Sequence, residues 1–342
     1  YIPLRGHKYY DDLSAPKAQN NMNSYFHWTI SNQLSFNRTF GDHSVNAVAV
    51  YEAEKQGIQT SQIVGTGTAG DDKIRTTKGK TIDLTETYNN KYAYTFASWL
   101  VRAQYSYKGR YMVSASIRGD GSSRFAPDCR WGWFPSVSFG WNLGNEPFME
   151  DSGIDLKFRA SYGRTGNQEG ISPWAYHAKM SGGKNYGGQS GIAVSDFGNR
   201  NLRWEKADQY DVGFDLAFLK GKVNMIFDIY QKNTFDLLYN KPVAAHTGTT
   251  STLSNIGSIR NRGVEFTLNT HFNFGKHFSW LSQFNISHNK NIIKSLTGED
   301  IIGSNRILRA GEEVGSWYVF EQLGIYQYDG EVPDPQLSLI HI

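Results

Sequence analysis

Two short motifs contain residue types that could take part in chemistry. The first, Gly65-Thr66-Gly67-Thr68-Ala69-Gly70, has the glycine spacing of a dinucleotide-binding turn. Such a turn needs a buried strand before it and a helix after it, so that backbone amides face the pyrophosphate. Acidic and threonine-rich residues follow instead. The pattern therefore indicates a flexible loop.

The second motif, Asp120-Gly121-Ser122-Ser123-Arg124, contains a serine and a carboxylate. It lacks a third acidic ligand and a neighbouring base, so we interpret it as a turn that leaves a strand beginning near Tyr111. The nine histidines are isolated, and no His/Asp/Glu group has metal-ligand spacing. Cys129 is the single cysteine, which excludes an internal disulfide framework. The sequence predicts no enzyme active site, metal or cofactor.

Aromatic residues in the long polar segments are a further group of candidates. Their rings could stack on sugars or pack the loops together, and packing is the favoured interpretation. We keep four of them as candidate ligand contacts: Trp174, Tyr176, Tyr186 and Trp204.

Composition narrows the class of protein that must position these residues. The 342 residues carry 35 basic and 32 acidic side chains, a net charge of +3 without a basic block, so nucleic-acid binding is not expected. Aromatic residues make up 14% and there are 35 glycines, which favours many strands and turns. No segment approaches the roughly 18 apolar residues of a transmembrane helix. Any membrane crossing would therefore be made by strands.

Period-two alternation of apolar and polar residues is the main structural signal. Residues 211–218 place Val212 and Phe214 on one face and Asp211 and Asp215 on the other, and 223–230 repeat the pattern after a short link. Clear alternation also marks 99–107, 111–117, 133–141, 154–162, 264–274 and 278–286, with weaker strands at 24–40, 43–54 and 316–328. We count about eleven antiparallel strands.

Length and spacing of these strands indicate a membrane barrel. Short links near 41–42, 108–109, 220–221 and 275–276 alternate with long ones near 55–91, 121–131, 166–204, 236–256 and 291–315, as in barrels with short periplasmic turns and longer extracellular loops. The link near 144–153 is intermediate and falls on the short side.

Two tryptophans on strand 133–141 fit the girdles of such a barrel. Trp133 and Trp141 share a face and stand eight residues apart, a distance of about 26 Å along a strand. A tilt of about 40° reduces this to about 20 Å, close to the roughly 25 Å apolar band. Pro135 shares that face and predicts a bulge, because proline cannot donate a ladder hydrogen bond.

The polar faces predict how a barrel would work. Five charged residues would face a wet lumen: Arg159, Asp211, Asp215, Asp228 and Glu265. Their expected role is hydration and selectivity. A soluble or surface-anchored glycan-binding β protein also alternates its faces and stays the alternative. The barrel is favoured because many strands reach the length of about 9–11 residues that a membrane requires. A barrel enzyme is a third possibility, but no base lies beside a nucleophile.

Four segments together resemble the SusC/RagA family of TonB-dependent outer-membrane transporters, over about residues 20–335. They are Ile117–Phe125 with Arg130–Ser138, Leu156–Gly163 with Thr165–Asn167, Asn201–Lys206, and Asn255–Ser258 with Asn261–Glu265. Each is weak alone, whereas four in family order are specific.

The resemblance implies a 22-stranded barrel that encloses an N-terminal plug. It implies a Gram-negative outer-membrane location, TonB as the energy source, a SusD-like surface lipoprotein as partner, and oligosaccharides or peptides as cargo. The resemblance leads us to expect that the plug, the TonB-contacting N-terminal region and the closing strands of that family are absent from this chain. We expect residues 1–336 to be a partial barrel domain, an open curved sheet in a truncated reading frame, and 337–342 to be a non-native tail.

Overall fold

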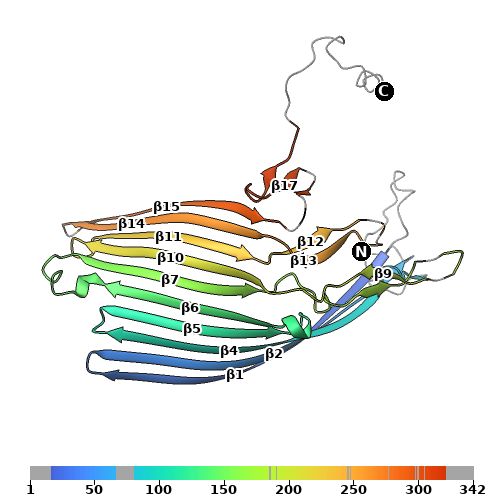
Figure 1. Ribbon diagram of the computed structural model, residues 1–342, viewed down its shortest axis with the longest axis horizontal. Coiled ribbons are helices and arrows are strands. Elements are labelled where there is room, and N and C mark those ends of the chain that lie inside the picture. Colours follow the sequence, from blue (N-terminus) through green and yellow to red (C-terminus); the bar gives the residue numbers. More distant parts are fainter. Residues whose placement is uncertain are drawn as a thin grey trace, which may run out of the picture.

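The computed structural model describes residues 17–66 and 81–320, except positions 185, 190, 245, 247, 276, 297, 299 and 304. Its main element is one antiparallel sheet of eleven strands in the order β1-β2-β4-β5-β6-β7-β10-β11-β14-β15, with β3 beside β2. The strands lie side by side in a single layer (Figure 1). In this described part no helix is long and apolar enough to cross a membrane.

The strands of the main sheet are long. They are β1 Lys17–Phe40, β2 His43–Thr66, β3 Thr81–Ile82, β4 Tyr88–Tyr107, β5 Tyr111–Ser122, β6 Trp131–Asn142, β7 Asp155–Asn167, β10 Glu205–Phe218, β11 Val223–Phe235, β14 Ser258–Phe274 and β15 Phe278–Ser295. Apart from the two-residue β3, each exceeds the 5–6 residues of an average globular strand. The predicted all-β, antiparallel, open sheet is therefore confirmed.

Three small sheets were not predicted. They pair β8 Lys179–Ser181 with β9 Ala193–Asp196, β12 Leu238–Pro242 with β13 Ser251–Asn255, and β17 Arg306–Leu308 with both β16 Ile301–Ile302 and β18 Ser316–Trp317. The predicted strand at 316–328 is wrong in its described part, because only Ser316–Trp317 pair, with β17. The rest from residue 321, including the suspected tail 337–342, lies outside the described residues.

The long link predicted at 55–91 is wrong at both ends. Strand β2 continues to Thr66 and pairs with β1 along its whole length, and β4 already begins at Tyr88. Residues 57–62 of β2, Gly-Ile-Gln-Thr-Ser-Gln, carry polar side chains on both faces, so the alternation disappears although the backbone ladder continues. Gly65 and Thr66 of the glycine motif belong to β2, and residues 67–70 lie outside the described residues.

Connections at the two ends of the sheet differ as the sequence predicts, with one exception. Tight turns gather at one end and the small sheets at the other (Figure 1). Gly41 and Gly109 have φ of +57° and +65° in two of these turns, which favours glycine because a Cβ is strained there. The exception is the connection 143–154 on the short-turn side, which is longer than the connection 123–130 on the other side.

Strands β5 and β6 correct two local predictions. The motif from Asp120 to Ser122 continues β5, and Arg118 Nε binds Asp120 Oδ1 at 2.7 Å. Gly119 does not end the strand but makes room for an indole, because a Cβ there would lie 2.7 Å from Trp133 Cζ3. No bulge occurs at Pro135, since β5 and β6 pair without a register shift. Pairing of β6 with β7 starts only at Ser136, so no ladder bond to β7 is needed at the proline.

Register gives the sheet one continuous apolar face. Phe158, Phe214, Phe227 and Phe266 are consecutive partners across β7, β10, β11 and β14, and the Phe214 and Phe227 rings stack at 5.2 Å. At the short-turn end, stacked rings connect Tyr107 to Tyr111 and Tyr111 to Trp141. The opposite face carries the charged candidates.

Candidate passage-lining site

The five charged candidates lie on one face of the sheet. Register makes Arg159, Gly213, Asp228 and Glu265 consecutive partners across β7, β10, β11 and β14. Asp211 and Asp215 stand two residues before and after Gly213, so strand alternation places them on the same face. The structure therefore brings the predicted set together, while a role in lining a passage stays a prediction.

Arg159 is the centre of this charged row. Its Nη2 donates to Asp215 Oδ1 at 2.9 Å and to Asp228 Oδ1 at 3.0 Å. The three side chains are 34%, 38% and 20% exposed, so water still reaches the row. Such partly hydrated pairs contribute about 0.2–1 kcal/mol each, and their main effect is to fix the positions of the charges.

Gly213 makes the contact between Arg159 and Asp228 possible across the intervening strand. A Cβ on Gly213 would lie 2.0 Å from Asp228 Oδ1 and 2.8 Å from the Phe227 carbonyl oxygen. Without that Cβ, a side chain of β7 meets one of β11 over the backbone of β10. Period-two alternation over residues 211–218 places Gly213 on the polar face, but it did not reveal this role. A glycine between two aspartates inside a strand was the available signal.

Gly213→Ala should separate Arg159 from Asp228. We expect a loss of about 1 kcal/mol in the free energy of unfolding, because a charge-assisted contact is broken. The measurement is the urea midpoint of the folded band in heat-modifiable gel migration, made in a full-length receptor carrying this segment. Gly163→Ala on the same face is the control, since its Cβ would meet only Ser136 Cβ at 3.6 Å. Equal midpoint shifts for both variants would contradict the proposed contact.

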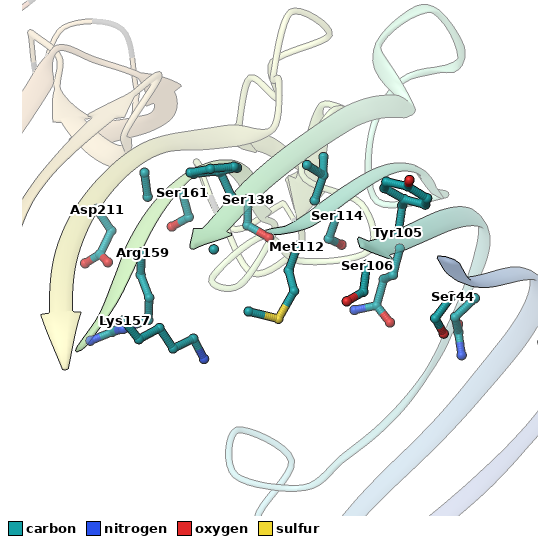
Figure 2. Close-up of a pocket in the computed structure, with 16 residues that line it drawn as sticks. Ser44, Tyr105, Ser106, Met112, Ser114, Ser138, Lys157, Arg159, Ser161 and Asp211 are labelled. Carbon is teal, nitrogen blue, oxygen red and sulfur yellow. The ribbon is translucent and has the colours of Figure 1, made fainter. Parts of the chain in front are cut away.

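A hollow of about 470 Å³ lies beside the charged row. Figure 2 shows Met112, Lys157 and Arg159 extending from β5 and β7 toward the same side. Much of the remaining lining is short and hydroxyl- or amide-bearing: Ser44, Asn46, Gln104, Ser106, Ser114, Ser138 and Ser161. Such side chains leave room for water and offer both donors and acceptors. A second hollow of about 480 Å³ contains Arg159, Asp211, Asp228 and Glu265.

The four aromatic candidates are separated by the fold. Trp204 is 4% exposed and packs against Phe125 and Phe134, with ring centroids at 5.0 and 5.6 Å. Its Nε1 donates to the Arg130 carbonyl oxygen at 2.8 Å. The structure thus favours the packing interpretation for Trp204.

The other three aromatic candidates lie in the segment that joins β7 to β10. Trp174 is 50% and Tyr186 91% exposed, so both rings are accessible to a ligand. The ring centroids of Tyr176 and His177 lie 4.1 Å apart.

The connections around Trp204 form one packed unit, which we call the loop body (residues 123–130, 168–204 and 236–257). Its core contains Phe125, Ile171, Ala175, Leu202 and Trp204, which pack together with Phe134 of β6. Asn199 Nδ2 donates to the Leu253 carbonyl oxygen at 3.1 Å, and Asn255 exchanges two hydrogen bonds with the Arg203 backbone at 2.8 and 2.9 Å. These three connections therefore pack against one another at the long-loop end of the sheet.

The strands are long, and the sheet has one apolar face and one charged, hydrated face. Short turns connect the strands at one end and long, packed loops at the other. These features define the class of outer-membrane β-barrel proteins. Within that class, the chain belongs to the TonB-dependent receptor family, of the SusC/RagA type. The family model described as "TonB dependent receptor-like, beta-barrel" matches residues 4–336. The family places the protein in the outer membrane of Gram-negative bacteria.

Two relatives show the extent of the likeness. A TonB-dependent receptor of Formosa agariphila is 34% identical over 313 residues, which are 90% of this chain and 30% of that protein. The TonB-dependent receptor SusC of Bacteroides thetaiotaomicron is 33% identical over 69% of this chain and 26% of its own length. The chain thus spans less than a third of these relatives.

Solved structures have the same fold. The RagAB peptide transporter superposes with a TM-score of 0.82 and 25% identity, over 91% of this chain and 35% of that chain. The outer-membrane transporter YddB from Escherichia coli superposes with a TM-score of 0.55 at 10% identity, which shows the fold alone.

Proposed function

We propose that this segment is part of the wall of an outer-membrane importer that is energised through TonB. The apolar face, with Phe214 and Phe227, contacts lipid, and the opposite face, with Arg159 and Asp228, lines a hydrated passage. The observation that carries the proposal is that the same strands present apolar side chains on one face of the sheet and charged side chains on the other. Carboxylates and a guanidinium retain water on the lumen side, whereas Lys or Arg at the lipid midplane costs about 2–4 kcal/mol.

The proposed cargo is an oligosaccharide or a peptide, captured with a SusD-like surface lipoprotein. SusC, a relative at 33% identity, and the RagAB peptide transporter, which has the same fold, support this choice. The serines of the hollow and the mixed charges of the row suit either cargo, because both present many hydrogen-bonding groups. Contact with TonB is proposed through a region N-terminal to this segment.

Uptake by cells tests the proposal. A full-length receptor carrying this segment should import a fluorescent oligosaccharide or a fluorescent peptide, and deletion of TonB should reduce import to the level of cells without the receptor. Competition with unlabelled oligosaccharides and peptides then assigns the cargo class. Import that is unchanged without TonB would contradict the proposal.

The alternative, a soluble or surface-anchored glycan-binding β protein, makes a different prediction. Such a protein would be recovered in buffer without detergent, and its migration in a gel would not depend on heating. The proposed barrel requires detergent and migrates differently before and after boiling.

A further inference from the structure

In the described part of the chain, two facing cations near the long-loop edge of the apolar face have no ion-pair partner. Tyr162, Tyr210, Gln231, Arg262 and Lys290 are consecutive partners across β7, β10, β11, β14 and β15. Arg262 therefore stands directly opposite Lys290, and both are exposed. Within residues 81–320, as far as described, neither side chain has an ion-pair partner. Like charges in directly opposite positions repel, so an anion between them would be stabilising.

A neighbouring cation near this edge shows the contrast. Arg164 Nε and Nη2 bind Asp208 Oδ1 and Oδ2 at 2.6 and 2.8 Å, so that guanidinium is neutralised within the protein. Arg262 donates only its Nε, to Gln231 Oε1 at 2.6 Å. That bond orients the guanidinium and leaves its two terminal nitrogens available to an acceptor.

A groove of about 580 Å³ connects this pair to the apolar face. Its floor is formed by Val212, Ile229 and Val264, which are the next row of partners toward the short-turn end. Arg262, His288 and Lys290 form its rim. An apolar floor under a cationic rim is complementary to an amphiphile with an anionic head and hydrocarbon chains.

We propose that this groove binds a phosphorylated lipid of the extracellular leaflet, with a phosphate between Arg262 and Lys290 and an acyl chain along Val212, Ile229 and Val264. The position supports this occupant, because the groove is continuous with the apolar face and lies toward the long-loop end, which is extracellular in barrels of this kind. Guanidinium and ammonium groups are the usual phosphate ligands. The inference rests on the proposed function for the orientation of the apolar face toward lipid.

Lipid binding to the full-length receptor carrying this segment tests the inference. Lipid A is titrated into receptor in non-ionic detergent, and bound lipid is counted by native mass spectrometry. Dephosphorylated lipid A and inorganic phosphate are separate arms. The double variant Arg262→Gln/Lys290→Gln should raise the Kd for lipid A about tenfold or more, since a tenfold change corresponds to about 1.4 kcal/mol. Lys157→Gln/Lys232→Gln removes two cations from the opposite face and should leave the Kd within about twofold.

Each outcome has one meaning. Equal affinity of the Arg262/Lys290 variant and wild type overturns the inference, as does equal binding of dephosphorylated lipid A. Displacement of lipid A by millimolar inorganic phosphate also overturns it, because the acyl groove would then contribute nothing. Heat-modifiable migration, recorded on the same samples, shows that each variant is folded. If the wild-type receptor imports cargo but does not bind lipid A, only this inference is refuted. If the wild-type receptor is recovered in buffer without detergent, the proposed function is refuted.

Discussion

Phe227→Lys in a full-length receptor carrying this segment should prevent most of the protein from reaching the folded barrel. Phe227 lies midway along the outward row of β11, between Val223 and Ile229, and stacks on Phe214 at 5.2 Å. A lysine at the lipid midplane costs about 2–4 kcal/mol, and the lost ring packing adds to that cost. The folded fraction is measured by heat-modifiable migration after refolding into vesicles.

The neighbouring position provides the matched control. Asp228→Asn changes charge on the opposite face, where Asp228 is 20% exposed and binds Arg159 at 3.0 Å. Its expected effect is below about 1 kcal/mol, because the pair is partly hydrated. Phe214→Asp and Asp215→Asn form a second matched pair on β10. Equal folding yields within both pairs would refute our assignment of the lipid and lumen faces.

Trp204→Ala should loosen the loop body while the barrel strands stay folded. The indole is 4% exposed and contacts three phenylalanine rings: Phe96, Phe125 and Phe134. Truncation of such a buried tryptophan costs about 3–5 kcal/mol. It also removes the hydrogen bond from the indole Nε1 to the Arg130 carbonyl oxygen, which then accepts only from the Ser122 amide. We expect residues 168–204 to become sensitive to protease and to exchange amide hydrogens faster by more than tenfold, since tenfold corresponds to about 1.4 kcal/mol.

Trp174→Ala in the same connection separates packing from ligand contact. Trp174 is 50% exposed, so its removal should change local stability by no more than about 0.5 kcal/mol. If Trp174 contacts cargo, import should fall without a change in proteolysis. If the Trp174 and Trp204 variants were equally sensitive to protease, the packing of the buried Trp204 would not be what holds the loop body together.

The sequence determined the fold class and the two faces of the strands. Period-two alternation is a local property, so Phe214 and Asp215 could be assigned to opposite faces without knowing what surrounds them. The motifs from Ile117 to Glu265 gave the family. The same alternation failed where β2 extends past Lys55, because a stretch with polar side chains on both faces has no apolar period. It also failed for the two- to five-residue strands of the loop sheets, which are too short to show one.

The tertiary structure alone decided which residues meet. Charged residues on β7, β10 and β11 were predicted for one face. Only the register of these strands brings Arg159 into contact with Asp215 and Asp228, which are 56 and 69 positions away in the sequence. The same holds for Trp204, which looked like the other loop aromatics until long-range packing buried it. Arg262 opposite Lys290 is likewise a result of register. Such contacts are not encoded in local periodicity, because a shift of one residue in strand pairing would exchange every partner.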